Sequence, residues 1–432
     1  MGSHLSIVIK NANIIDGTGQ PPRRGDIAID HGVISRISYA SEGAVGSSAK
    51  VSEGGSLVIP ATGKYLLPGL MDSHLHLNGC STPGRTVVKL WHLTTAWPMK
   101  MLHGVNNARK LLECGFTTVR VMGMPWSMDV HIRDAVEQGI LQGPRMLCSG
   151  HALSMTAGHG DLQVPPWALR DESLNADGVD ECIKAVRKRI REGVDFIKIH
   201  NSGGIMSDND KLEWRNYRIE EIRAICEEAH AFERRVAAHA EGIEGVRTAL
   251  LGGVDTVEHG VYLDDECIEL LLEKKAYLIP TLCISYACSS IGEATGVPKA
   301  LIEKGKRAAE SHIKSFQAAY KAGVKIALGS DAFNLTRIGD NGREYSLMEK
   351  AGMPPLDVIK AGTRGAADAL GILDKTGTIE EGKCADLILL NKDPLRDMTI
   401  VGTPAETSLV MKEGAIIINK VGGVEGAHDG NQ

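Results

Sequence analysis

Six side chains of types that can bind metal ions occur at or near the ends of short apolar segments along the chain. They are His74, His76, Lys198, His239, His259 and Asp331. The segments are rich in β-branched residues, which is typical of buried parallel strands. His74 and His76 are two residues apart, so in a strand their imidazoles point to the same side and can reach one ion. Together the six residues indicate a binuclear metal site.

Each of these residues also has an ordinary structural interpretation when it is taken alone. A single histidine at a strand end is often just a polar residue with a hydrogen-bond partner. Lys198, in VDFIKIH, could pair with a nearby acid, because an unpaired ammonium is costly to bury. Asp331, in VKIALGSDAF, could be a helix N-cap. We favour the metal site because all six residues occupy the ends of predicted strands.

Eight such apolar segments alternate with helical patterns through the middle of the chain. The predicted strands lie at 66–77, 116–123, 144–150, 194–200, 235–240, 254–260, 276–282 and 324–331. Predicted helices include 104–115, 176–193 and 218–233, and glycine closes several of them. Eight strand–helix repeats predict an α/β fold of the (β/α)8 barrel type, in which active sites lie at the C-terminal strand ends. The six candidate ligands fall at these ends.

The two ends of the chain have a different pattern, of short strands separated by turns. It covers 6–19, 26–38 and 56–69, and it returns at 383–395 and 407–419. Asp-Gly and His-Gly pairs mark the turns. We therefore expect a small β-sandwich-like domain built from residues 5–65 and 371–422, with the barrel at 66–370 between them.

The composition is that of an ordinary globular enzyme. The 432 residues carry a net charge of −6, which gives no reason to expect a nucleic acid partner. No apolar run approaches a membrane span, and the N-terminus lacks the pattern of a secretory signal. Nine cysteines without regular spacing favour reduced thiols. We expect a cytoplasmic homo-oligomer that acts on a small molecule.

Candidate substrate-binding residues lie in the segments that follow the third and fourth predicted strands. His151 and His159 could donate hydrogen bonds to a carbonyl or carboxylate, and Arg215 and Tyr217 could bind an α-carboxylate. Each could instead stabilise its loop. The five tryptophans follow strands one to four, where they could line an apolar pocket or pack loops together: Trp91, Trp97, Trp126, Trp167 and Trp214. Three acids leave a cationic substrate open: Asp161, Asp208 and Asp210.

Several motifs resemble those of the amidohydrolase superfamily over nearly the whole chain. They are IIDGTG, LLPGLMDSHLHL, GHALSMTAGHGD, VDFIKIHNSGGIMS, VAAHAEG, VDTVEHGVYLDD, GSDAF and GTIEEGKCADLILLNKDPL. The sequence is most similar to the imidazolonepropionase-like branch, which includes Xaa-Pro dipeptidases and Xaa-Arg/Lys carboxypeptidases. Imidazolonepropionase itself has a single metal ion and does not use this lysine. Lys198 therefore favours the binuclear, peptidase-like members.

The resemblance implies a role for each candidate ligand. His74, His76 and Asp331 would bind a buried metal ion, and His239 and His259 a more exposed one. Lys198 would be N-carboxylated and bridge the two. Zn²⁺ suits imidazole and carboxylate ligands, acidifies bound water and polarises carbonyl groups. Asp331 would be the catalytic residue, accepting a proton from water and passing it to the leaving amine.

Three functions follow, from two classes of protein. The first is a hydrolase of an amide next to a free carboxylate, as in a dipeptide or N-acyl amino acid, with an apolar or aromatic side. The second is a hydrolase of a xenobiotic amide, carbamate or urea, of the ochratoxin type. The third is a non-catalytic assembly protein on the same fold. Such proteins lose metal ligands, whereas all six candidates are present here.

Overall fold

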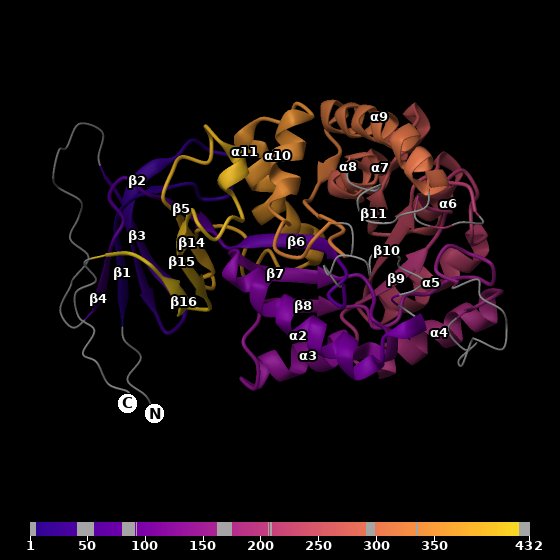
Figure 1. The fold of residues 1–432 in the computed structure, drawn as a ribbon, viewed down its shortest axis with the longest axis horizontal. Helices are drawn as coiled ribbons and strands as arrows, with labels where there is room; N and C mark the ends of the chain where they lie inside the picture. Colours follow the sequence, from indigo (N-terminus) through magenta and orange to yellow (C-terminus); the bar gives the residue numbers. More distant parts are fainter. Residues whose placement is uncertain are drawn as a thin grey trace.

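The computed structural model of the chain describes residues 6–40, 56–79, 91, 93–161, 175–205, 207, 210–290, 299–333 and 336–422. These residues form a mixed β-sheet built from both chain ends and an α/β part built from the middle of the chain (Figure 1). Only Gly69 separates the last N-terminal strand of the sheet from the first strand of the α/β part. None of the described helices is long and apolar enough to cross a membrane.

The terminal sheet brings together strands that lie far apart in the sequence. Its strands are β1 (Ile7–Ile14), β2 (Arg23–Asp30), β3 (Val33–Tyr39), β4 (Leu57–Pro60), β5 (Tyr65–Pro68), β14 (Leu387–Leu390), β15 (Thr407–Lys412) and β16 (Ala415–Asn419). Their order is β16-β15-β14-β5-β1-β2-β3, with β4 also paired to β1. The strands therefore form one connected sheet, where a sandwich-like pair was expected. The domain boundaries stay predictions, and β5 lies across the first of them.

Local sequence explains how this sheet turns. His31 and Gly32 join β2 to β3 with φ values of 50° and 82°. Two consecutive positive φ values are what a tight hairpin turn needs to match the twist of its strands. The expected His-Gly turn is thus confirmed. Alternate side chains of β1, β2 and β14 share a buried apolar cluster with β4 and β15.

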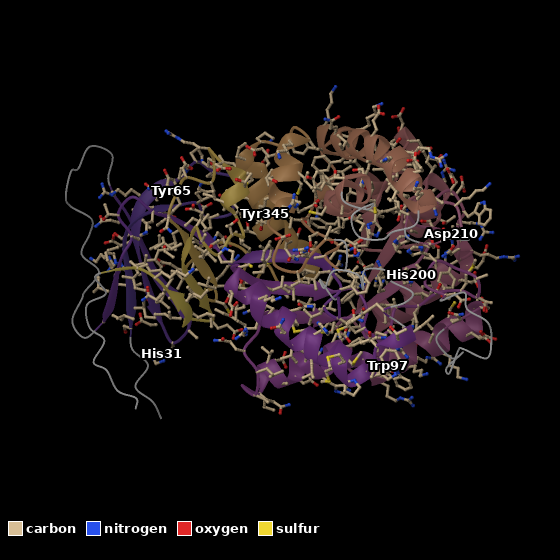
Figure 2. The ribbon with its side chains drawn as sticks, viewed as in Figure 1. His31, Tyr65, Trp97, His200, Asp210 and Tyr345 are labelled. Atoms are coloured by element: carbon tan, nitrogen blue, oxygen red, sulfur yellow. The ribbon has the colours of Figure 1, made fainter. Side chains whose placement is uncertain are left out.

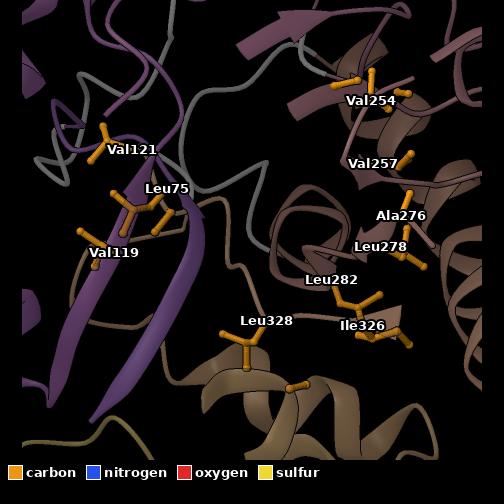
Figure 3. Packing of buried hydrophobic residues seen from close by; sticks show 14 of the residues in the cluster. Leu75, Val119, Val121, Val254, Val257, Ala276, Leu278, Leu282, Ile326 and Leu328 are labelled. Carbon is orange, nitrogen blue, oxygen red and sulfur yellow. The ribbon is translucent and has the colours of Figure 1, made fainter. Parts of the chain in front are cut away.

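All eight expected strands of the α/β part are present. They are β6 (Leu70–Leu75), β7 (Phe116–Val121), β8 (Arg145–Cys148), β9 (Phe196–His200), β10 (Arg235–Ala240), β11 (Thr256–His259), β12 (Tyr277–Ile279) and β13 (Lys325–Ile326). Neighbouring strands pair in parallel. Their buried faces and the facing helices make up the main apolar core, part of which Figure 3 shows around Leu75, Val119 and Leu278.

The expected closed barrel is not formed by regular pairing, because the strands fall into two sheets. One has the order β6-β7-β8 and the other β13-β12-β11-β10-β9. Single bridges join the sheets, Leu75 to Ala332 and Leu153 to Ile199. The chain bends at both places: Gly150 has a φ of 64°, and Asp331 a φ of 51°. The ladder is interrupted where the backbone turns at the C-terminal strand ends.

Helices follow the strands and lie along the outside of the α/β part (Figure 1). They are α2 (Trp97–Glu113), α3 (Met128–Glu137), α4 (Val179–Arg191), α5 (Ile219–Ala231), α6 (Ile243–Gly252), α7 (Asp265–Lys274), α8 (Leu282–Ser290), α9 (Lys299–Ala322), α10 (Arg343–Lys350), α11 (Pro355–Lys360) and α12 (Ala366–Leu370). The expected helices at 104–115, 176–193 and 218–233 correspond to α2, α4 and α5. In α4, acidic residues in the first turn and basic residues in the last turn interact favourably with the helix dipole.

Candidate metal centre

His74 and His76 lie at the C-terminal end of β6 and meet one carboxylate. The Nε2 atoms of the two rings lie 3.4 and 3.3 Å from Oδ1 of Asp331. The three residues offer donor atoms that all lie within 4.8 Å of one another. The spacing of two residues therefore brings both imidazoles to one side, as the sequence predicted. Two imidazoles and a carboxylate form a ligand set that suits Zn²⁺ and related ions.

Asp331 is held in place by its own backbone. Its N–H donates to the carbonyl of His74 at 2.7 Å, and its φ of 51° is unusual for a residue other than glycine. Burial alone would raise the pKa of its carboxyl group. The neighbouring His74 and His76 outweigh this effect and hold the pKa well below its ordinary value. The carboxylate is therefore ionised and directed at the two rings.

Other imidazoles extend this group into a continuous cluster. The ring centroid of His259 lies 4.9 Å from that of His74 and 4.6 Å from that of His239. His159 stacks on His239 at 4.2 Å, with 9° between the rings. Burial lowers the pKa of both His239 and His259 well below the usual value. The two rings are thus neutral, as metal ligands must be.

Lys198 lies on β9 among these groups and is 2% exposed. The charges of Glu258, Asp331 and Arg120 act on its amine, but within the described part of the chain the amine forms no hydrogen bond or ion pair. Burial lowers its pKa to about 8. The expected alternative, a salt bridge to a nearby acid, is therefore not formed. A buried amine without a partner is costly, so it indicates a function that adds one.

Two residues that the sequence did not single out orient His74. Glu258 accepts a hydrogen bond from Nδ1 of His74 at 2.7 Å, which leaves Nε2 to face Asp331. Glu258 also pairs with the guanidinium of Arg120 at 2.8 Å, and Arg120 donates to the carbonyl of Ser73 at 2.6 Å. Such partners fix the orientation of metal-binding histidines and strengthen their affinity.

A second set of contacts orients His259. Its Nδ1 lies 2.7 Å from the hydroxyl of Thr281, and its carbonyl accepts a hydrogen bond from His312 at 3.0 Å. Both His259 and Thr281 have positive φ values, 72° and 50°. Strained backbone of this kind gathers at functional sites, where surrounding contacts hold it in place. The free ring nitrogen of His259 is thereby directed toward the cluster.

The donors that remain fit a metal site. His259 uses Nδ1 for its contact with Thr281. His74 uses Nδ1 for Glu258, and its Nε2 faces Asp331. His239 has its Nε2 3.3 Å from the carbonyl of Gly203, so Nδ1 is its free nitrogen. Imidazole nitrogens and an ionised carboxylate are groups that bind divalent ions.

His200 is a further member of the cluster that sequence reasoning missed. It follows Lys198 by two residues on β9, so strand alternation places it on the same side. Its ring centroid lies 5.5 Å from that of His159 and 5.7 Å from that of His239, and its buried Nδ1 has no hydrogen-bond partner among the residues that the structure describes. Figure 2 places it within the α/β part, away from the terminal sheet. The His-x-His logic that identified His74 could have found it as Lys-x-His.

The four predicted substrate-binding residues separate into two groups. His159 belongs to the cluster, and His151 acts electrostatically on His200. Tyr217 is fully buried in the apolar core, and its hydroxyl has no hydrogen-bond partner in the described part of the chain. Arg215 donates to the carbonyl of Tyr217 at 3.1 Å. Among the described residues, no hydrogen bond, ion pair or ring contact joins Arg215 or Tyr217 to the imidazole cluster.

The tryptophans and acids of the loops also have defined places. Trp91 is buried and donates to the carbonyl of Asn78 at 3.2 Å, whereas Trp97 and Trp126 form an exposed pair of rings 6.0 Å apart. Trp214 is exposed as well. Trp167 and Asp208 lie outside the described residues. Both described acids accept hydrogen bonds within the protein. Asp161 accepts from the N–H of Ala157, and Asp210 accepts from the amine of Lys304.

Comparison with known proteins agrees with this geometry. The amidohydrolase family matches residues 65–417, so the chain belongs to that family. It is a metal-dependent amidohydrolase, an enzyme that acts on C–N bonds. The sequence-based assignment to the amidohydrolases, with relatives of the imidazolonepropionase and prolidase type, is confirmed.

Individual relatives are similar over most of their length. The ochratoxinase of Aspergillus niger is 32% identical over 423 residues, which is 93% of this chain and 85% of the relative. A crystal structure of a Xaa-Pro dipeptidase with methionine bound in its active site superposes with a TM-score of 0.86 at 29% identity, covering 96% of this chain and all of that one. A prolidase in complex with N-methylphosphonate-L-proline has the same TM-score at 28% identity, with the same coverage of both chains.

Proposed function

We propose that this enzyme holds two divalent metal ions and hydrolyses an amide bond next to a free carboxylate, as in a dipeptide or an N-acyl amino acid. The observation that carries the proposal is the arrangement of two donor groups about one buried lysine. His74, His76 and Asp331 form the first group, and His239 and His259 the second. Lys198 would be N-carboxylated and bridge the ions, which accounts for a buried amine that has no partner among the described residues.

The chain's own residues would then handle the proton. The bound ions would supply Lewis acidity and a water of low pKa. Asp331, an ionised carboxylate beside the rings of His74 and His76, would take a proton from that water and return it to the departing nitrogen. Glu258 would keep the proton of His74 on Nδ1 and so hold the ring in position.

The substrate would be recognised beside the second group of donors. His159 uses Nδ1 for contacts within the protein, so Nε2 is free to meet a carbonyl or carboxylate of the substrate. Similarity to a Xaa-Pro dipeptidase and to a prolidase supports a carboxylate next to the scissile bond. The exposed pair of Trp97 and Trp126 would favour a substrate that is apolar or aromatic on one side.

The test combines metal analysis with a substrate screen. The Zn²⁺-loaded protein should hold two ions per chain by metal analysis. A crystal structure or solid-state NMR should show a carboxyl group on the Nζ atom of Lys198. Dipeptides and N-acyl amino acids should be hydrolysed about 10–100-fold better as free acids than as methyl esters, because the ester removes a charged contact. One ion per chain, or equal rates for acid and ester, would contradict the proposal.

A second candidate is the hydrolysis of a xenobiotic amide. The similarity to ochratoxinase, at 32% identity over 93% of the chain, favours an aromatic amide. Such a substrate would also suit the exposed Trp97 and Trp126. The same screen separates the two: a preference for the aromatic amide over every dipeptide, with little effect of the carboxylate, would select the second candidate.

A further inference from the structure

Lys304, on α9, joins that helix to the segment that follows β9. Its amine lies 2.6 Å from the carbonyl of Gly204, 2.9 Å from the carbonyl of Asp210 and 3.2 Å from that of Ser207. It also donates to Oδ1 of Asp210 at 2.9 Å. Lys304 and Asp210 are mostly buried, so this ion pair is screened little by solvent. The amine of Lys304 therefore binds several oxygens of the segment after β9, next to the candidate metal centre.

Asp210 connects Lys304 to His159, because one of its carboxylate oxygens contacts Lys304 and the other contacts His159. Its Oδ2 lies 3.3 Å from Nδ1 of His159 and 3.2 Å from the N–H of Gly204, while Ser207 Oγ lies 2.9 Å from the same Nδ1. Burial would raise the pKa of Asp210, but hydrogen bonds from His159, Ser207 and Lys304 hold it well below the usual value. Because an ionised carboxylate only accepts hydrogen bonds, Nδ1 of His159 carries a proton.

His159 has little room for any other orientation. One face of the ring stacks on His239 at 4.2 Å, and the ring packs directly on the backbone of Gly204. A Cβ at Gly204 would come within 2.2 Å of the ring carbon Cε1, so only glycine fits there. With Nδ1 engaged, Nε2 is the ring nitrogen without a partner among the described residues. Figure 2 shows Asp210 and His200 on the same side of the α/β part.

We propose that Lys304 is a positioning residue that fixes His159, through Asp210, with Nε2 toward the substrate. The proposal rests on the proposed function in one respect, that His159 meets the substrate. It adds a contact across the fold, since α9 lies about one hundred residues beyond the segment that it holds. Without the amine of Lys304, Asp210 loses the ion pair that holds its carboxylate, and its contact with Nδ1 of His159 is no longer fixed.

The tautomer gives a measurement that does not depend on turnover. In the Zn²⁺-loaded protein, the ¹⁵N chemical shifts of the His159 ring, assigned with a His159→Asn variant, should show the proton on Nδ1. Lys304→Met should move both ring nitrogens toward averaged values. The control is Lys306→Met on the same helix, whose ion pair with Glu303 is exposed, and it should leave the shifts unchanged. Unchanged shifts in Lys304→Met would overturn the proposal.

Kinetics then show whether Lys304 acts through His159. With the best substrate of the screen, Lys304→Met should lower kcat/KM by roughly 10-fold or more, as expected when a positioned hydrogen bond is lost. In a His159→Asn background the same substitution should change kcat/KM by less than about 2-fold. An equal loss in both backgrounds would mean that Lys304 only supports the fold. If the wild-type protein hydrolyses nothing in the screen, the proposed function fails, and the ¹⁵N shifts still decide the positioning role.

Discussion

Replacing Arg120 by methionine should destabilise the protein strongly, because the buried carboxylate of Glu258 would lose its ion-pair partner. Arg120 and Glu258 are almost fully buried, with side chains 3% and 0% exposed, and their charged atoms are 2.8 Å apart. Arg120 also donates to the carbonyl of Ser73 and to the hydroxyl of Thr256. Coulombic attraction to Arg120 is the main effect that keeps the pKa of Glu258 low against its burial. Removing one partner of such a pair costs about 3–5 kcal/mol.

The assay is denaturant unfolding of the metal-free protein, compared across a double-variant cycle. Arg120→Met and Glu258→Gln should each lower the free energy of unfolding, but the double variant should lose at least about 2 kcal/mol less than the sum, since neither charge is then left alone. Arg187→Met is the control, because its pair with Glu228 lies at the surface, and its unfolding should match the wild type.

The same cycle has a second readout at the metal site. Glu258 orients His74, so both single variants should bind Zn²⁺ about 10–100-fold more weakly than the wild type. The reasoning is refuted if Arg120→Met unfolds at the same denaturant concentration as the Arg187→Met control. It is equally refuted if the two single losses simply add in the double variant.

Three further predictions test other parts of the site and fold. Asp331→Asn should keep the fold by circular dichroism but lower kcat by 10²-fold or more, since an amide cannot accept the proton; near-normal kcat would assign the base to another group. Lys198→Ala should lose most activity and regain part of it with added acetate or propionate, and no rescue at any concentration would speak against a bridging carboxylate. Burial raises the pKa of Asp129 from 3.8 to about 7, so folding favours its protonated form and this stabilisation is lost as the pH rises from 4 to 7. The stability of Asp129→Asn relative to the wild type should therefore increase over that range, by up to about 4 kcal/mol, and a difference independent of pH would contradict it.

Local patterns in the sequence predicted the strands of the α/β part well, and they also predicted that His74 and His76 lie together. Strand alternation is a property of a few neighbouring residues, so the positions of β6 to β13 and the shared direction of His74 and His76 follow from it. The meeting of those rings with Asp331 also follows, once parallel strands place their C-terminal ends together. His200 was within reach of the same argument and was missed because its neighbour at that spacing is a lysine.

Other features depend on contacts between distant segments and could not be predicted in this way. Tyr217 resembles a binding residue in sequence, but the direction of the chain after β9 buries it in the core. The Arg120–Glu258 pair joins β7 to β11, and Lys304 joins α9 to the segment after β9. The barrel ladder is interrupted near Gly150 and Asp331, which both have positive φ values. None of these has a periodic signature.

The pairing of β5 with β14 has a consequence for the order of synthesis. Tyr65 pairs with Leu390, so β5 lacks its pairing partner on one edge until more than three hundred further residues have left the ribosome. Gly69, which connects β5 to β6, donates to the carbonyl of Asp386 at 2.7 Å. The strand that carries the first candidate ligands is therefore anchored by a segment that is made more than three hundred residues later. A nascent or truncated chain that ends before β14 would have the residues of the site without the anchor for their first strand.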